Sequence, residues 1–211
     1  AFGTNGSVGA GYNIGTFPKY NTNVSLNHRN KKINLFGNYN YNKSRNENYM
    51  ALNRQLFDTL FDQKSNMTFR NNSHGFKAGF DYFASNKTTF GIMVNGNLAD
   101  NTFSNDSRTP ITYLPTNTLV KILEAHNTSK SSRDNINFNA NYRFADTSGH
   151  ELNIDADYGM YKIKSNQLQP NFYYDPITGE ITGEAIYNMI APTDINIYSF
   201  KTDYEQDFKK G

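Results

Sequence analysis

The chain has 211 residues, a formal net charge of +2, no Cys and no Trp. A charge this close to balance argues against a nucleic-acid-binding protein, and the absence of Cys excludes disulfides and thiolate chemistry. Aromatic residues make up 15% of the chain although its mean hydropathy is −0.74. A chain that is rich in aromatics but polar on average is typical of a transmembrane β-barrel, in which only half of each strand faces lipid.

Eight segments alternate apolar and polar residues with period two, which predicts β-strands with one apolar face. The clearest lie within residues 132–166, where two such segments flank the turn residues Asp146–Gly149. Arg29–Lys32 and Ser85–Lys87 are further tight turns, and Gly15 and Pro18 break the first connection. In chain order the predicted strands cover residues 6–14, 19–28, 33–42, 76–82, 88–98, 135–144, 152–160 and, least clearly, 194–206.

Three long segments interrupt this rhythm and are predicted as loops. They cover about 43–72, 101–132 and 165–193, and short turns alternate with them. A helical turn is expected within residues 50–61, and residues 118–125 fit either a helix or a strand. Alternating short and long connections place every long loop at one end of an antiparallel meander, as in outer-membrane barrels. We therefore predict an all-β fold, an antiparallel up-and-down meander that forms part of a transmembrane β-barrel, over residues 1–211.

The alternation also predicts which side chains contact lipid. Strands of about 9–11 residues are long enough to cross a bilayer when tilted. The predicted lipid-facing residues are Val24, Leu26, Leu35, Phe80, Ile92, Val94, Phe138, Ala140, Ile154 and Ala156. Aromatic rings favour the two membrane interfaces, and the predicted aromatic girdle consists of Tyr12, Tyr20, Tyr39, Tyr41, Tyr82, Tyr142, Phe144, Tyr158 and Tyr204. Phe36 and Phe83 are exceptions that point to the opposite face.

No arrangement of reactive side chains predicts catalysis. None of the four His residues has a second His or a carboxylate at metal-ligand spacing. Asp155 and Asp157 share one face of a strand, and we interpret them as lumen-facing charges in preference to a glycosidase pair. No Ser-His-Asp grouping in the sequence is sufficient to argue for a catalytic triad, although this leaves spatial proximity open. The sequence therefore predicts no enzyme, metal site or cofactor.

Residues 6–46, GSVGAGYNIGTFPKYNTNVSLNHRNKKINLFGNYNYNKSRN, carry a family resemblance, and HELNIDADYGMY further on fits it. They resemble the opening of the barrel domain in the Bacteroidetes outer-membrane β-barrel family related to TonB-dependent receptors. The matching residues are Gly6, Gly9, Gly11, Pro18, Lys19, Tyr20, Asn21, Leu26, Asn27, Arg29, Lys31, Lys32, Asn34, Gly37, Tyr39 and Tyr41.

The resemblance implies a barrel of about 22 strands with an N-terminal plug, coupled to a periplasmic energy-coupling protein. The chain opens in a strand-like segment without a signal peptide and ends in DYEQDFKKG. We therefore expect a piece of a longer precursor, the first third or so of its barrel. Its expected partners are outer-membrane lipid, the remainder of the barrel, the plug and the coupling protein.

The expected function is that of a segment of an outer-membrane receptor barrel for uptake of a nutrient ligand, with long extracellular loops for ligand contact. The alternative is a soluble or surface β-rich binding module that buries the same apolar face inward, because periodicity cannot distinguish the two orientations. An outer-membrane enzyme is a third hypothesis. Siderophores, glycans and peptides all remain open as ligands.

Overall fold

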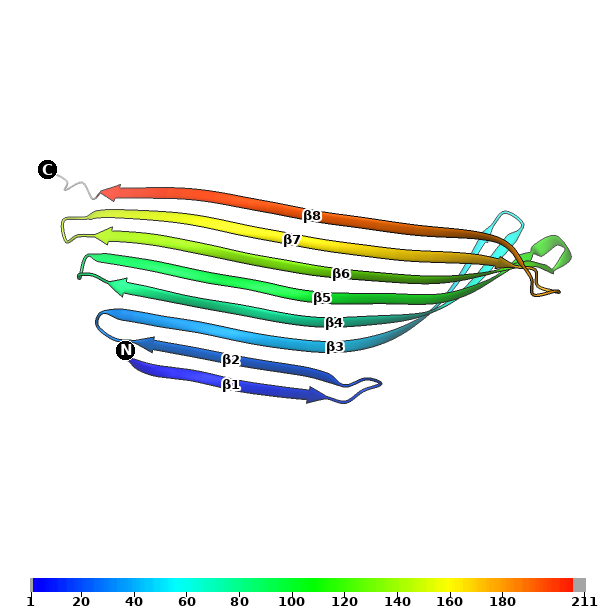
Figure 1. Cartoon of the computed structure of the whole chain (residues 1–211), viewed down its shortest axis with the longest axis horizontal. Helices are drawn as coiled ribbons and strands as arrows, with labels where there is room; N and C mark the ends of the chain where they lie inside the picture. Colours follow the sequence, from blue (N-terminus) through cyan, green and yellow to red (C-terminus); the bar gives the residue numbers. More distant parts are fainter. Residues whose placement is uncertain (1, 207–211) are drawn as a thin grey trace.

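A computed structural model describes residues 2–206, which form one antiparallel sheet (Figure 1). Eight strands follow one another in chain order, and each pairs only with its neighbours in the sequence. This confirms the predicted all-β up-and-down meander. The strands are β1 (Gly3–Asn13), β2 (Lys19–Arg29), β3 (Ile33–Leu56), β4 (Thr59–Phe83), β5 (Thr88–Tyr113), β6 (Thr118–Ala145), β7 (His150–Tyr174) and β8 (Ile181–Gln206).

The sheet is a single layer that does not close on itself. β1 pairs only with β2, and β8 pairs only with β7, so each leaves one backbone edge open at opposite sides of the sheet (Figure 1). No hydrophobic residue among those described is fully buried. Within residues 2–206, no helix is long and apolar enough to cross a membrane. The described part of the chain thus lacks the second layer that a folded soluble sheet packs against.

The connections alternate between the two ends of the sheet (Figure 1). The predicted tight turns near 30, 86 and 147 are confirmed at one end. Asn30 Oδ1 accepts the backbone N–H of Lys32 at 2.8 Å, and Asp146 Oδ1 accepts that of Ser148 at 2.8 Å. Such Asx turns favour tight reversals. All connections that follow odd-numbered strands lie at the other end.

The prediction of three long loops was wrong about their conformation. β3 to β8 contain between 24 and 28 residues each and run straight through the segments 43–72, 101–132 and 165–193. These segments are long hairpins that continue the sheet. Hydrophobic alternation misses them because both of their faces are polar, while the backbone ladder continues unbroken for most of their length.

Neither of the two segments for which a helix was considered is helical. Residues 118–125 open β6, so the strand interpretation of that segment is confirmed. The helical turn predicted within 50–61 was wrong, because β3 continues to Leu56 and β4 begins at Thr59. Phe57 adopts a left-handed φ of 50°, which allows the chain to reverse in two residues. A single 3-10 turn, Leu114–Thr116, lies in the β5–β6 connection.

Two prolines account for the breaks in the ladders of the hairpins. The β4–β5 pairing is interrupted between Phe61 and Lys64, opposite Pro110, although Pro110 still pairs with Ile122 of β6. The β6–β7 pairing is likewise interrupted opposite Pro170, which still pairs with β8. Proline has no N–H and can keep only one of its two ladders.

Candidate functional site

The register of the ladder sorts every side chain onto one of two faces of the sheet. Val94 pairs with Phe138, and Phe138 pairs with Tyr158, so these three residues share one face. Their neighbours Asn95, Asn137 and Gly159 pair in the same way and share the other. We call these the apolar face and the amide face and keep the two names along the whole length of the strands.

All ten predicted lipid-facing residues lie on the apolar face, where they form a band across the sheet. Ile92 pairs with Ala140, and Ala140 with Ala156, near the middle of this band. The band is uncovered: Ile92 is 62% exposed. On β6 it runs from Ile136 to Phe144, about 27 Å of strand, which matches an apolar belt of about 25 Å. Lipid contact itself stays a prediction.

The nine predicted girdle aromatics also lie on the apolar face, and several stack across strands. Tyr12 pairs with Tyr20, with ring centroids 5.2 Å apart, at the hairpin side of the band. Tyr142 contacts Phe90 at 5.1 Å near the short-turn side. Phe36 and Phe83 lie on the amide face as expected, because Phe36 pairs with Gly79 and Phe83 with Thr89.

The band shifts along the strands from one edge of the sheet to the other. The aromatic residue of the band nearest the long hairpins is Tyr12 on β1 and Tyr198 on β8. Followed strand by strand, the cross-strand pairing leads from Tyr198 to Gly6 of β1, which lies six residues before Tyr12. Six residues are about 20 Å of strand, over strand spacings that total about 34 Å. For the band to lie level in a bilayer the strands must tilt by about 30°, close to the roughly 35–45° of closed barrels.

Within the band the amide face is a network of side-chain amides. Asn139 donates to Asp157 Oδ1 at 2.7 Å, and Asn141 donates to Asn139 Oδ1 at 3.1 Å. Several of these amides lie over a glycine on the next strand. A Cβ at Gly91 would overlap the amide of Asn141, and the same holds for Gly9, Gly11, Gly75 and Gly159 with their own Asn partners. Glycine leaves room for the amide to lie flat on the wall.

Beyond the band the amide face carries no charged side chain over four consecutive rows of β3 to β8. We call these rows the uncharged wall. The charged residues interspersed with these rows along the strands, Arg45, Glu47, Arg70, Asp106 and Lys130, fall on the opposite face. Amides and hydroxyls dominate the uncharged wall. Its members are Ser44, Asn46, Asn48, Met50, Ser65, Met67, Phe69, Asn71, Asn101, Phe103, Asn105, Ser107, Ala125, Asn127, Ser129, Ser131, Ser165, Gln167, Gln169, Asn171, Ala185, Tyr187, Met189 and Ala191.

An aromatic pair and unsatisfied amides mark the middle of the uncharged wall. Phe69 and Phe103 pair across strands with ring centroids 4.8 Å apart. A shallow hollow of about 130 Å³ surrounds them. The Oδ1 atoms of Asn71, Asn105 and Asn127 are buried without a hydrogen-bond partner. Each of these oxygens therefore lacks a hydrogen bond that it could accept.

The hydrophobic pattern of the sequence does not reveal the uncharged wall, because the wall lies inside the predicted loops. A different signal was present in the sequence. Acidic and basic residues of these segments fall on alternate positions, as at Asp100, Asp106 and Arg108 of β5, while Asn101 and Phe103 between them are uncharged. A period of two in the charged residues indicates a β-strand, just as a period of two in the hydrophobic residues does.

The other residues considered from sequence are dispersed. His28 contacts Thr4 Oγ1 at 2.7 Å, His74 contacts Tyr39 at 2.7 Å, and His126 contacts Asp106 at 2.8 Å. His150 lies 2.9 Å from Tyr204. Residues 2–206 contain no group of three or more His, Asp or Glu that could hold a metal ion. Asp155 and Asp157 both lie on the amide face, as predicted.

One protein-family model matches part of the chain. Residues 143–211 match the model described as the outer membrane protein beta-barrel family. Within the described residues this match covers the end of β6 with β7 and β8, whereas the resemblance noted above was strongest near the start of the chain. A search of curated proteins finds no match.

The fold and this match together support an outer-membrane β-barrel protein. An open meander is the structure expected for one part of a larger barrel whose two edge strands lack their partners. The protein therefore resides in the bacterial outer membrane.

Proposed function

We propose that the chain is a segment of a TonB-dependent-receptor-like barrel that takes up a nutrient ligand. The apolar face contacts lipid, the amide face lines the lumen, and the long hairpins extend outside the cell. The observation that carries this proposal is the uncharged wall, which directly continues the amide face beyond the band. In this proposal the chain is a binding and transport structure, not an enzyme.

The proposal includes the parts of the barrel that complete the sheet. β1 and β8 each present an unpaired edge, which in a membrane must pair with further strands. The remainder of the barrel, a plug in the lumen and a periplasmic energy-coupling protein supply closure and gating. A soluble module with its apolar face inward would need a second layer, and the described residues form only one.

The chemistry of the uncharged wall indicates a neutral polar ligand. Amide and hydroxyl groups can donate and accept hydrogen bonds without favouring either sign of charge. The Phe69–Phe103 pair adds an apolar surface against which a ring or a flat group can stack. Removing the two rings would take away that surface and leave the hydrogen-bonding groups in place.

Uptake in cells tests this proposal. Cells that carry the full-length protein are given a defined mixture of neutral oligosaccharides, uronic-acid oligosaccharides and short peptides, and depletion of each is followed by mass spectrometry. A strain lacking the protein and a strain with Phe69→Ala and Phe103→Ala are compared. We expect the protein to accelerate depletion of neutral solutes, and the double substitution to slow it at least severalfold.

A control replaces Tyr49 and Phe172, two aromatics of the long hairpins that lie on the opposite face, by alanine. Uptake should then be unchanged. A protonophore should abolish accumulation if the barrel depends on energy coupling. Depletion of uronic acids alone, or rates equal to those of the deletion strain, would overturn the proposal.

A further inference from the structure

Two rows of the apolar face, just beyond the band, are strongly basic. They cross β3 to β7 through ten paired positions, of which five are basic and one, Asp100, is acidic. We call these rows the basic rows. The first row contains Lys43, Asn72, Asp100, Ser132 and Lys164, and the second contains Arg45, Arg70, Thr102, Lys130 and Asn166.

The basic rows bring like charges together, and most of these charges have no acidic partner. Arg45 pairs directly with Arg70 across strands, an arrangement that destabilises a sheet. Arg45 contacts Glu47 at 3.3 Å and stacks over the Phe17 ring at 3.6 Å. Among the described residues, the other four basic side chains of these rows form no salt bridge. An anion bound here would relieve this repulsion.

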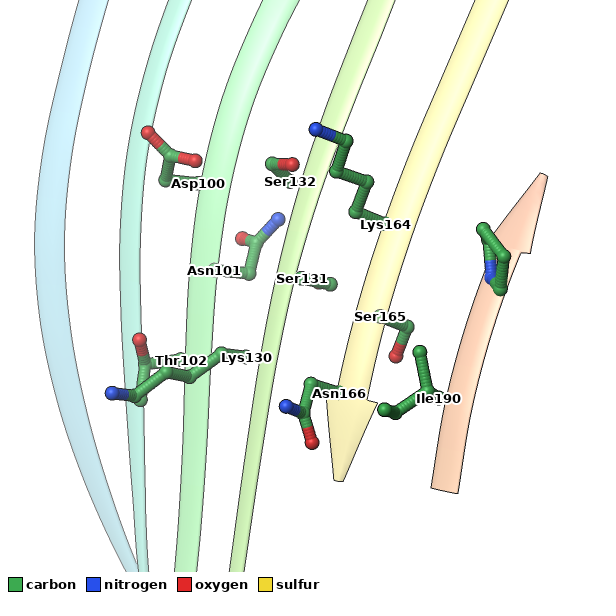
Figure 2. A pocket seen from close by; sticks show the side chains of 11 residues that line it. Asp100, Asn101, Thr102, Lys130, Ser131, Ser132, Lys164, Ser165, Asn166 and Ile190 are labelled. Carbon is green, nitrogen blue, oxygen red and sulfur yellow. The ribbon is translucent and has the colours of Figure 1, made fainter. Parts of the chain in front are cut away.

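A groove runs along the part of the rows on β5 to β7. It has a volume of about 500 Å³ and is open to the outside of the sheet. Figure 2 shows Lys130 lying across Thr102, while the Lys164 side chain extends toward Ser132. Ammonium and hydroxyl groups thus line the same groove, and Asp100 is its one acidic group.

The level of the basic rows on the strands places them at the membrane surface. Tyr41 and His74 pair at the edge of the band. Lys43 lies two residues beyond Tyr41 on β3, and Arg70 lies four residues beyond the level of His74 on β4. These steps correspond to about 7–13 Å along a tilted strand. The polar headgroup layer of a bilayer extends several ångströms to either side of its hydrocarbon core.

We propose that the basic rows bind the phosphate groups of phosphorylated glycolipids in the outer leaflet. This rests on the part of the proposed function in which the apolar face contacts lipid and the hairpins extend outward. Guanidinium groups form paired, charge-assisted hydrogen bonds to phosphate oxygens, and lysines add further donors. Ser132 and Thr102 can donate to the same oxygens.

Native mass spectrometry of the full-length protein in detergent tests the proposal. The probes are diphosphorylated lipid A and the same lipid after removal of its phosphates. One variant carries Arg70→Gln and Lys130→Gln. The matched control carries Arg133→Gln and Lys77→Gln, which remove the same two residue types from the amide face.

We expect the protein to retain diphosphorylated lipid A in preference to the dephosphorylated lipid. At roughly 1 kcal/mol for each basic residue near a lipid surface, the first variant should bind it about 30-fold more weakly. The control should bind like the wild type. Inorganic phosphate should compete poorly, because it lacks the acyl chains that the apolar band holds.

The possible outcomes separate the two proposals. Equal binding of both lipids, or no effect of either variant, would overturn the lipid site and leave the uptake proposal standing. An effect of the control variant alone would mean that the amide face is turned toward lipid, which would overturn both. Full competition by inorganic phosphate would show that the ligand of the basic rows is a free anion and not a lipid.

Discussion

The environment of a side chain in this sheet depends on whether its position in the strand is odd or even. Ala140 lies mid-band on the apolar face, between Ile92 and Ala156, whereas Asn139 beside it lies on the amide face against Asp157. One residue step therefore changes the predicted surroundings from hydrocarbon to a polar lumen.

Arginine substitutions at these two neighbouring positions provide a direct test of this difference. Ala140→Arg should reduce the free energy of unfolding by roughly 2–4 kcal/mol, because a charge on the lipid side must leave water near the bilayer midplane. Asn139→Arg should have little effect, since Asp157 lies within reach. Urea unfolding of the full-length protein in lipid vesicles measures both. Equal losses at the two positions would contradict lipid contact by the apolar face.

A second prediction at this scale concerns the turn between β6 and β7. The backbone N–H groups of His150 and Ser148 bond to Asp146 and lower the pKa of its carboxyl group. Since the folded-state pKa lies below the ordinary value, this carboxylate stabilises the turn above about pH 4, and the effect is lost as pH falls through the lowered pKa.

Hydrogen-exchange protection factors at Ser148 and His150, measured against pH, should follow that titration. Asp146→Asn keeps an acceptor oxygen but cannot titrate, so its protection factors should not change over the same range. A wild-type turn whose protection is independent of acid pH would show that the carboxylate contributes nothing.

At the scale of elements, the strands β3 to β8 are more than twice as long as a membrane requires. About 9–11 tilted residues cross a bilayer, whereas β5 has 26 and β6 has 28. Cross-strand pairs hold the extra length in register. Arg108 lies opposite Glu124 at 3.3 Å, and Asp106 lies opposite His126 at 2.8 Å. Opposite charges in direct pairing favour one register of a polar hairpin.

Backbone hydrogen exchange distinguishes these hairpins from loops. Amides of residues 101–108 and 128–131 should exchange slowly, because these residues lie in ladders on both sides. The amides of Gly15 and Thr16, which are exposed in the β1–β2 connection, serve as the reference. If both sets exchanged within seconds, residues 101–132 would form a mobile loop as first predicted from hydrophobicity.

At the scale of the whole molecule, the main feature is the open sheet. β1 and β8 expose unpaired backbone groups, and lipid offers no hydrogen-bond partners to replace water. The edges also offer templates for aggregation. Closure by further strands is therefore a condition for stability in the membrane.

Separate expression of residues 1–211 tests this dependence. We expect the fragment to aggregate in detergent and to run on SDS gels at one position whether or not it is heated. The full-length protein should migrate differently before and after heating, as a closed barrel that resists SDS. A fragment that showed the same heat-dependent shift would form a closed barrel by itself.

The amino-acid sequence alone was sufficient to predict the meander, its tight turns and the two faces near the membrane. Alternation at Ile136–Phe144 and Leu152–Met160 reports directly on burial in an apolar medium, so it identifies strands wherever one face meets that medium. Asn30 and Asp146 indicated turns because their side chains bond to nearby backbone N–H groups.

The tertiary structure was needed for the length of the hairpins, the uncharged wall and the basic rows. In residues 43–72 and 101–132 both faces are polar, so hydrophobicity carries no period there, and strand formation depends on a ladder between segments distant in sequence. Arg45 and Arg70 are 25 residues apart along the chain, and only the register makes them direct neighbours. Cross-strand register therefore decides which residues act together, because it is set by pairing between strands and not by the composition of any one strand.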